Sequence, residues 1–410
     1  MRAIGTGFVA GLAALMTLGC GGQDEAKLER VAEEYLNSGK ASGHVKDYIK
    51  GAQKAAVSHA AKLAGERPEG NLMISPFSYQ ECLGMVRLGA LGDTNKELAK
   101  WLGTGEDSAK TASAMMANRS SLKPLVDAGI ISTANGVWVS SAAQIEPGYL
   151  KQVQQSFNAE VKVSQFPQPA LTEINSFVKE QTKGRIEKIL EELDPYSRMV
   201  LVNAIHFKDK WHKPFKKERT KEEPFHAPDG PKQVFMMHGG EGFSGARKEG
   251  FLFVSTQFKT GLRVAFALPP SKEDPVEKCL EPLMKMVGET FSLEVSEVAL
   301  PKFKSEFTWN MKPSMQAMGV SLPFDVERAQ FGGMSKEPLS ISQIVQKTFV
   351  QFDEEGVEAA AVTAADMAAG SAPMDEEPVR FIADRPYAYV IYDKDGMPLF
   401  LGIVRDPIKG

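Results

Sequence analysis

The chain has 410 residues, of which 43% are hydrophobic and 24% are charged, and its formal net charge is −4. This composition is typical of a soluble globular protein with a large core. The small net charge gives no indication of a nucleic-acid partner. No repeat period and no Pro/Gly/Ser-rich linker divides the sequence, so we expect one large domain.

The N-terminus has the pattern of an export signal. Arg2 supplies a positive charge, and residues 3–18 form an apolar run that is too short to cross a bilayer comfortably. The following Gly19-Cys20 resembles a bacterial lipoprotein signal, in which the cysteine is acylated and the peptide is cut just before it. An ordinary secretory peptide with an incidental cysteine is the alternative. We predict a signal peptide over residues 1–19, a lipid on Cys20, and an exported protein anchored in the bacterial cell envelope, at the outer membrane or cell surface.

Residues 20–44 are interpreted as a tether with local helix, and residues 45–410 as the folded domain. The helical signal in the tether consists of apolar residues at suitable spacing: Leu28, Val31, Ala32 and Tyr35. Cys82 and Cys279 lie in apolar segments with helical spacing, so we expect two buried, inert thiols. A single disulfide between them is the alternative.

Helix and strand signals alternate along the rest of the chain. Apolar residues from Val45 to Ala60 recur at helical spacing, and Ser75-Pro76 places a capping serine before a helix. The run MVLVNAIHF at 199–207 is apolar on both faces, as expected of a strand in the middle of a sheet. Further strands are predicted at residues 135–139, 264–269, 298–301, 348–352, 387–393 and 398–404.

Residues 354–366 read EEGVEAAAVTAAD and have almost no side-chain volume. Alanine favours helix, but Gly356 precedes the run, β-branched residues interrupt it, and no apolar stripe at helical period accompanies it. A segment of such small residues can slide between two existing strands without overpacking their neighbours. We therefore interpret it as a moving part.

Several segments together resemble the serpins, the serine-protease inhibitor family. The matching motifs stand in the family's order and spacing: NLMISPFS at 71–78, INSFV and TKGRI within 174–186, NAIHFKDKW at 203–211, EEGVEAAAVTA at 354–364, FIADRPY at 381–387 and FLGIV at 400–404. The resemblance covers nearly all of residues 45–408. It implies the serpin fold, which is of the α+β class, with three β-sheets, about eight to nine helices and an exposed reactive-centre loop near the C-terminus.

The resemblance also implies roles for individual residues. The hinge of the reactive loop comprises Glu354, Gly356, Val357, Glu358, Ala359, Ala360, Ala361 and Val362. The family has a buried polar "shutter" beneath the central sheet, and the matching residues here are Ser75, Ser78, Asn203 and Gln346. It also has a "breach" at the top of this sheet, which Trp211 matches. Gln346 stands where the family has a histidine. Because an amide does not titrate, pH-dependent opening through this position is expected to be absent.

Catalytic and metal-binding motifs are absent from the sequence. None of the six histidines lies in H-E-x-x-H, and neither G-x-S-x-G nor C-x-x-C occurs. We therefore predict no enzymatic activity, no metal and no cofactor. The basic stretch at 208–221 is interrupted by acidic residues and is interpreted as solvated surface, with a polyanion site as the alternative.

The function implied by the resemblance is suicide-substrate inhibition of serine proteases by a monomer. The protease acylates the exposed loop, and the loop inserts into the central sheet before deacylation. No Arg or Lys occurs between Lys347 and Arg380, which favours elastase-, subtilisin- or chymotrypsin-like targets over trypsin-like ones. The candidate residues at the scissile bond are small or apolar: Gly370, Ser371, Ala372 and Met374. The alternatives are a non-inhibitory serpin and a cross-class inhibitor of papain-like cysteine proteases.

Overall fold

The computed structural model describes residues 13–157, 159–357 and 377–409, and for residues 13–23 it describes the main chain only. Within these residues the chain forms three β-sheets and nine α-helices, which confirms the expected α+β class. The helices are α1 (Ala13–Asn37), α2 (Gly43–Glu66), α3 (Pro76–Arg87), α4 (Gly92–Leu102), α5 (Ser108–Asp127), α6 (Pro147–Phe157), α7 (Ala170–Gln181), α8 (Leu280–Lys285) and α9 (Met311–Ala317). Three short 3₁₀ helices are η1 (Lys217–Arg219), η2 (Val276–Cys279) and η3 (Leu322–Phe324).

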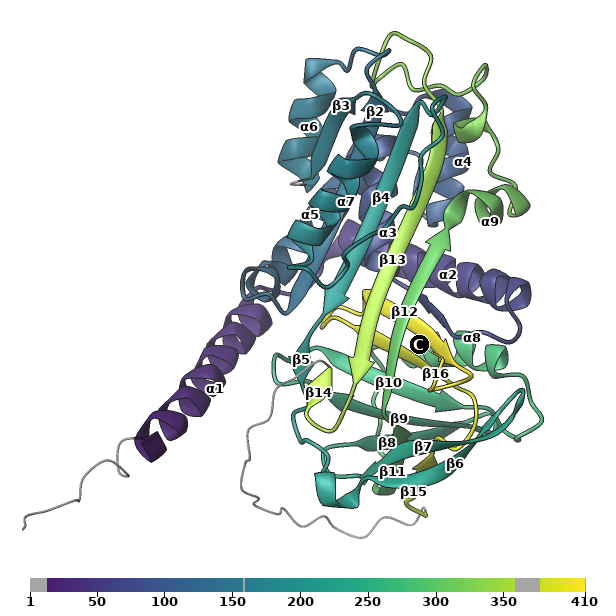
Figure 1. Ribbon diagram of the computed structural model, residues 1–410. Helices are drawn as coiled ribbons and strands as arrows, with labels where there is room; N and C mark the ends of the chain where they lie inside the picture. The colour runs from purple at the N-terminus through teal and green to yellow at the C-terminus, as the bar shows by residue number, and fades with distance from the viewer. Residues whose placement is uncertain (1–12, 158, 358–376, 410) are drawn as a thin grey trace, which may run out of the picture.

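The central sheet (Figure 1) contains the longest described strand, β13 (Ile341–Phe352). Its strands, in spatial order, are β3 (Glu160–Ser164), β2 (Ile131–Ser140), β4 (Met199–Phe207), β13 and β12 (Phe303–Asn310), with β14 (Gly356–Val357) and β5 (Asp209–Lys210) at one end. β4 and β13 are direct parallel neighbours, whereas β2 and β12 flank them in antiparallel pairings. The sheet is therefore closed between β4 and β13.

Two further sheets complete the fold. The six-stranded sheet has the order β1 (Leu72–Ile74), β17 (Pro398–Val404), β16 (Tyr387–Tyr392), β10 (Arg263–Leu268), β9 (Phe251–Gln257) and β8 (Ser244–Lys248). The four-stranded sheet has the order β15 (Val379–Ile382), β11 (Val295–Pro301), β7 (Gly230–Gly239) and β6 (Lys221–Ala227). The described chain thus leaves the central sheet after β14 and re-enters the fold at β15, in the four-stranded sheet.

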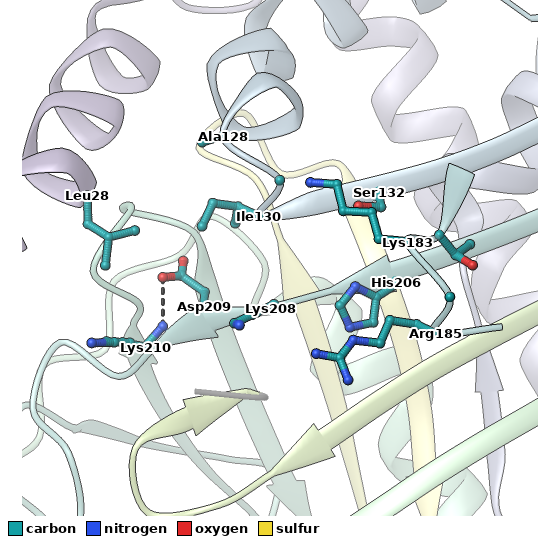
Figure 2. A pocket seen from close by; sticks show the side chains of 13 residues that line it. Leu28, Ala128, Ile130, Ser132, Lys183, Arg185, His206, Lys208, Asp209 and Lys210 are labelled. Carbon is teal, nitrogen blue, oxygen red and sulfur yellow. Dashed lines mark hydrogen bonds between the residues drawn. The ribbon is translucent and has the colours of Figure 1, made fainter. Parts of the chain in front are cut away.

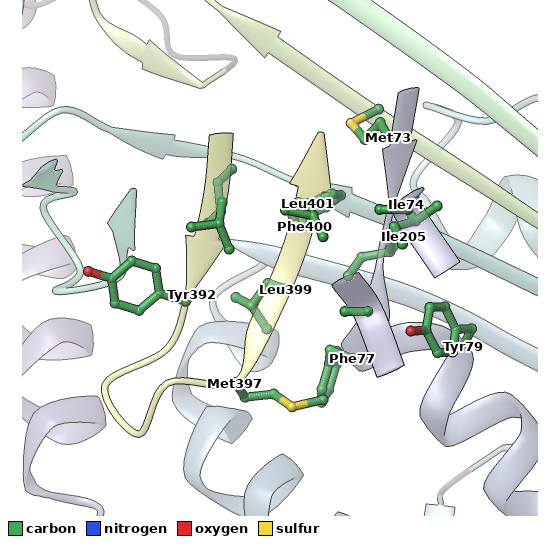
Figure 3. Close-up of a cluster of buried hydrophobic side chains, with 14 of the residues drawn as sticks. Met73, Ile74, Phe77, Tyr79, Ile205, Tyr392, Met397, Leu399, Phe400 and Leu401 are labelled. Atoms are coloured by element: carbon green, nitrogen blue, oxygen red, sulfur yellow. The ribbon is translucent and has the colours of Figure 1, made fainter. Parts of the chain in front are cut away.

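Helix α3 lies in the core between the central and six-stranded sheets, and all of its residues are buried. Ser75 caps it by accepting a hydrogen bond from the Ser78 amide at 3.3 Å, as the sequence predicted. Figure 3 shows the apolar cluster around the start of this helix, where Phe77 lies among side chains of β1, β4 and β17. The helix therefore forms the floor beneath β2 and β4.

The opposite face of β4 is covered by α7. Val200 and Val202 are buried there, together with Trp138 of β2 and Ile174 of α7, in a second and smaller cluster. With α3 beneath it and α7 above it, β4 is buried along its whole length, as its nearly continuous apolar sequence predicted.

The predicted helix in the N-terminal segment is part of α1, which extends away from the body in its first turns (Figure 1). Near its C-terminal end Tyr35 is fully buried, and its hydroxyl accepts a hydrogen bond from the Lys394 amide at 2.7 Å. Among the described residues, no helix combines the length and apolar character that crossing a bilayer requires. Cys82 and Cys279 are buried free thiols, as predicted.

Candidate functional site

The hinge begins as a tight hairpin at the end of β13. The Asp353 amide donates to the Gly356 carbonyl at 2.9 Å, and Phe352 of β13 pairs with Val357 of β14. On its other side β14 pairs with β5, with Gly356 opposite Lys210. Of the predicted hinge, Glu354, Gly356 and Val357 are thus placed together. The other predicted loop residues lie outside the described residues: Glu358, Ala359, Ala360, Ala361, Val362, Gly370, Ser371, Ala372 and Met374.

Trp211 binds this hairpin at the end of the central sheet where β13 ends. Its indole is 1% exposed and stacks on Phe258, with the ring centroids 5.0 Å apart. The indole Nε1 donates to the Asp353 carbonyl at 2.8 Å, and the Trp211 amide donates to the Glu355 carbonyl at 3.0 Å. The predicted breach residue therefore holds the turn that precedes the loop, in addition to filling core space.

Glu354 adds a buried carboxylate to the same contact. It is 5% exposed and accepts hydrogen bonds from Lys302 at 2.7 Å and from Thr220 at 2.8 Å. Burial acts to raise the pKa of Glu354, but the hydrogen bonds from Lys302 and Thr220 hold it below its usual value. The hinge therefore carries a charged anchor at neutral pH. Its two partners lie far away in sequence, and neither was predicted.

The cavity in Figure 2 adjoins the hinge beside β5. It has a volume of about 420 Å³, and four of its lining residues are cationic: Lys183, Arg185, Lys208 and Lys210. Asp209 is 2% exposed at its edge and accepts hydrogen bonds from the Thr260 hydroxyl and, at 2.8 Å, from the Lys210 amide. Burial raises the pKa of Asp209 to about 7.

The four predicted shutter residues meet halfway along the central sheet, and each is fully buried. Gln346 is bound to the start of α3 twice: its Nε2 donates to the Ser75 carbonyl at 3.0 Å, and its Oε1 accepts from the Ser75 amide at 2.9 Å. The same Nε2 donates to Oδ1 of Asn203 at 2.5 Å, and Asn203 Nδ2 donates to the Ser78 hydroxyl.

The network continues beyond the predicted residues. Asn203 also donates to Oδ1 of Asn135, and Asn135 Nδ2 donates to the Glu81 carboxylate at 3.3 Å. Arg119 of α5 forms an ion pair with Glu81 at 3.3 Å. In the sheet register Asn135 lies opposite Asn203, and Asn203 lies opposite Gln346. Three neighbouring strands thus contribute one row of amides that faces α3.

A comparison with protein-family models matches residues 50–407 of the chain to the serpin (serine protease inhibitor) model. The chain belongs to the serpin family. An uncharacterised serpin-like protein of Thermococcus kodakarensis is 33% identical over 363 residues, which cover 85% of this chain and 83% of the relative. The leukocyte elastase inhibitor of Bos taurus is 32% identical over 373 residues, which cover 86% of this chain and 97% of the relative.

Among solved structures, Serpin48 of the insect Tenebrio molitor matches with a TM-score of 0.77 and 28% identity, covering 88% of this chain and 98% of Serpin48. The expected serpin fold is therefore confirmed. Serpins are generally inhibitors of proteases. The part of this serpin that the structure describes contains no group of three or more His, Cys, Asp or Glu residues placed to hold a metal ion.

Asn135 and Glu81 are functional candidates of this serpin that sequence reasoning missed. A signal for Glu81 existed, because it lies three residues after Ser78 and therefore on the same side of α3. It is also a charged residue in a helix that is buried on every side. Asn135 had no comparable signal, since its role depends on the register between β2 and β4.

Proposed function

We propose that this serpin is a suicide-substrate inhibitor of serine proteases with elastase-, subtilisin- or chymotrypsin-like specificity, and that it is not an enzyme. The observation that carries the proposal is the position of the hinge. Val357 is already paired with the last residue of β13, on the edge of β13 that faces β4, because β12 occupies the other edge. A loop that continues from Val357 can therefore fold back between β4 and β13.

Strand polarity favours this insertion. β4 and β13 are parallel, and the loop returns antiparallel to β13, so it is antiparallel to both neighbours. One parallel pairing is then replaced by two antiparallel pairings, which are slightly more stable per residue. The small side chains that follow Glu358 fit such a closed space, and residues 359–365 carry neither charge nor proline.

Insertion accounts for trapping by geometry. A protease that has acylated the loop is dragged along when the loop enters the sheet, and its active site is distorted. A misplacement of about 1 Å can reduce a rate by about 10²-fold. Loss of an oxyanion-hole donor lowers the rate by roughly another 10²–10³-fold. The distorted acyl-enzyme is then not hydrolysed on a useful timescale.

The test is incubation of residues 21–410 with pancreatic elastase, chymotrypsin, subtilisin and papain, read on denaturing gels and by mass spectrometry. A band at the summed mass is expected for at least one protease, and the released C-terminal peptide identifies the scissile bond. Clean cleavage with no adduct for any of them would support the non-inhibitory alternative. Adducts with papain alone would support the cross-class alternative.

A matched pair of hinge variants separates trapping from simple binding. Val357 is fully buried, and strand alternation places Ala359 on the same face of an inserted strand and Glu358 on the solvent face. Ala359→Arg should abolish the adduct while leaving loop cleavage intact, because an unpaired charge would be buried. Glu358→Arg should still form the adduct. Equal trapping by both variants would contradict insertion.

The proposal includes an anchor at Cys20 and export to the bacterial cell envelope, with a monomeric inhibitor reaching its target from the membrane. The sequence of residues 1–20 supports this part. Expression in a bacterial host with radiolabelled palmitate should label the protein, and Cys20→Ser should remove the label and release the protein from membranes. Labelling that persists in Cys20→Ser would place the lipid elsewhere.

A further inference from the structure

The shutter of this serpin ends in a carboxylate. Every amide N–H in the row is directed the same way, from Gln346 to Asn203, from Asn203 to Asn135 and from Asn135 to Glu81. Glu81 lies on α3, it is 2% exposed, and its two oxygens accept from different donors. Oε1 accepts from Arg119, and Oε2 accepts from Asn135.

Strand entry must break this connection. Admitting a strand separates β4 from β13 by about one strand spacing, 4.7–4.9 Å. Gln346 of β13 is bound twice to the main chain of Ser75, whereas Asn203 of β4 reaches α3 through one side-chain hydrogen bond to Ser78, so we expect the start of α3 to stay with β13. Asn135 moves with β4, because β2 and β4 are paired along their whole contact. The hydrogen bond from Asn135 to Glu81 therefore crosses the boundary that moves.

The ionised form of Glu81 fits its surroundings best. A carboxylate only accepts hydrogen bonds, and here each oxygen faces an N–H donor. A proton on either oxygen would face one of these donors and displace it. Hydrogen bonds to a charged acceptor are also roughly twice as strong as neutral ones. The connection to β2 is thus strongest when Glu81 is charged.

We propose that Glu81 is a positioning residue for sheet opening, whose carboxylate holds β2 on α3 through Asn135 until protonation weakens the contact and speeds entry of the loop. This inference rests on the proposed insertion mechanism and concerns its regulation. It assigns pH sensitivity to a residue outside the predicted shutter, where Gln346 itself does not titrate.

The charge state of Glu81 changes near neutral pH. Burial raises the pKa of Glu81 to about 7, against the opposing effect of Arg119 from α5. The other titratable groups that interact with its charge are Tyr48 from α2 and Cys82 on α3 itself, and burial raises the pKa of each well above neutrality. Within this cluster, Glu81 is the group that gains a proton between pH 8 and pH 6.

Sheet opening can be measured without a protease. A synthetic peptide with the sequence of residues 357–371 should enter the closed sheet as a strand, and the complex can be separated from free protein on native gels. For the parent protein we expect uptake to be about fivefold faster at pH 6 than at pH 8, the difference between a charged and a neutral hydrogen bond. Glu81→Gln should take up peptide at the faster rate at both pH values.

Two further variants make the test specific. Arg119→Gln should move the midpoint of the pH step upwards, since Arg119 lowers the pKa of Glu81. Asp209→Asn should keep the step, although burial also raises the pKa of Asp209 to about 7. A step that survives in Glu81→Gln, disappears in Asp209→Asn, or runs in the opposite direction would overturn the inference. A flat profile in the parent would overturn it while leaving insertion intact, whereas no uptake at any pH would contradict insertion as well.

Discussion

Gly356 offers a direct way to destabilise the closed hinge without touching the inserted state. Its φ is +153°, and a Cβ at this position would lie 2.2 Å from the Asp209 carbonyl oxygen and 2.6 Å from the Lys210 Cα. Both contacts are to backbone, so no side chain can move aside. Gly356→Ala should therefore push β14 away from β5. In an inserted strand the residue would have ordinary extended backbone, which alanine tolerates.

The expected acceleration can be estimated from the backbone strain that alanine would bear at position 356. A residue held in a backbone region that only glycine adopts costs of order 1–3 kcal/mol. If only the closed state bears this cost, spontaneous conversion to the inserted state should accelerate roughly 5- to 150-fold. The purified protein is held at constant temperature, and samples are scored for the fraction that survives a heat step. Survivors are expected to be the inserted form, because they have gained a strand.

A second glycine provides the control. Gly288 has a φ of +84°, it lies outside the hinge, and a Cβ there would meet nothing within 4 Å. Gly288→Ala introduces comparable backbone strain in the closed and inserted states alike, so it should lower overall stability without changing the rate of conversion. Equal acceleration in both variants, or an unchanged rate in Gly356→Ala, would refute the role given to the β14–β5 contact.

Three other changes test the breach, the core and the loop. Trp211→Phe keeps an aromatic ring but removes the donor to the Asp353 carbonyl and leaves a small cavity, so thermal unfolding of the closed form should reveal a loss of at least about 1 kcal/mol. Burial lowers the pKa of His59 from 6.5 to about 3. Between these two pH values His59 is therefore protonated in the unfolded chain and neutral in the folded chain. The free energy of unfolding should therefore fall as pH drops from 6.5 towards 3, by up to about 1.4 kcal/mol per pH unit. Urea titrations at several pH values should show that the free energy of unfolding of His59→Gln depends less steeply on pH. Met374→Arg should confer trypsin inhibition, and no gain would count against Met374 as the specificity residue.

The elements that the sequence predicted best are those with an uninterrupted local signal. The run MVLVNAIHF predicted β4 at its observed bounds, because a strand covered on both faces needs no polar side. The Ser75 cap was also local, since a capping serine bonds within its own first turn. The shutter residues were predicted through the family motifs, and the structure joins all four of them.

Long-range partners were not predictable in this way. Glu354 is anchored by Lys302, which lies between β11 and β12, and by Thr220, which lies between η1 and β6. Nothing in the spacing of these residues indicates the contact. Asn135 likewise gains its role from the pairing of β2 with β4, and a shift of one residue would have turned its side chain towards α7. Residues whose function depends on register therefore require the structure.

The same register bears on how a buried polar row can survive insertion. Phe352 pairs with Val357, so six residues further along each strand Gln346 would face Thr363 of an inserted loop. Thr363 lies outside the described residues, but its hydroxyl can both donate and accept, as an amide that has lost Asn203 requires. Thr363→Val should therefore lower the stability of the loop-cleaved, inserted form by about 1–3 kcal/mol and leave the closed form unchanged. Urea titration of both forms would measure this difference, and an equal loss in each would argue against the extrapolated register. A small polar residue at this one place in an otherwise apolar run is what a sheet needs if its shutter must be hydrogen-bonded both before and after a strand enters.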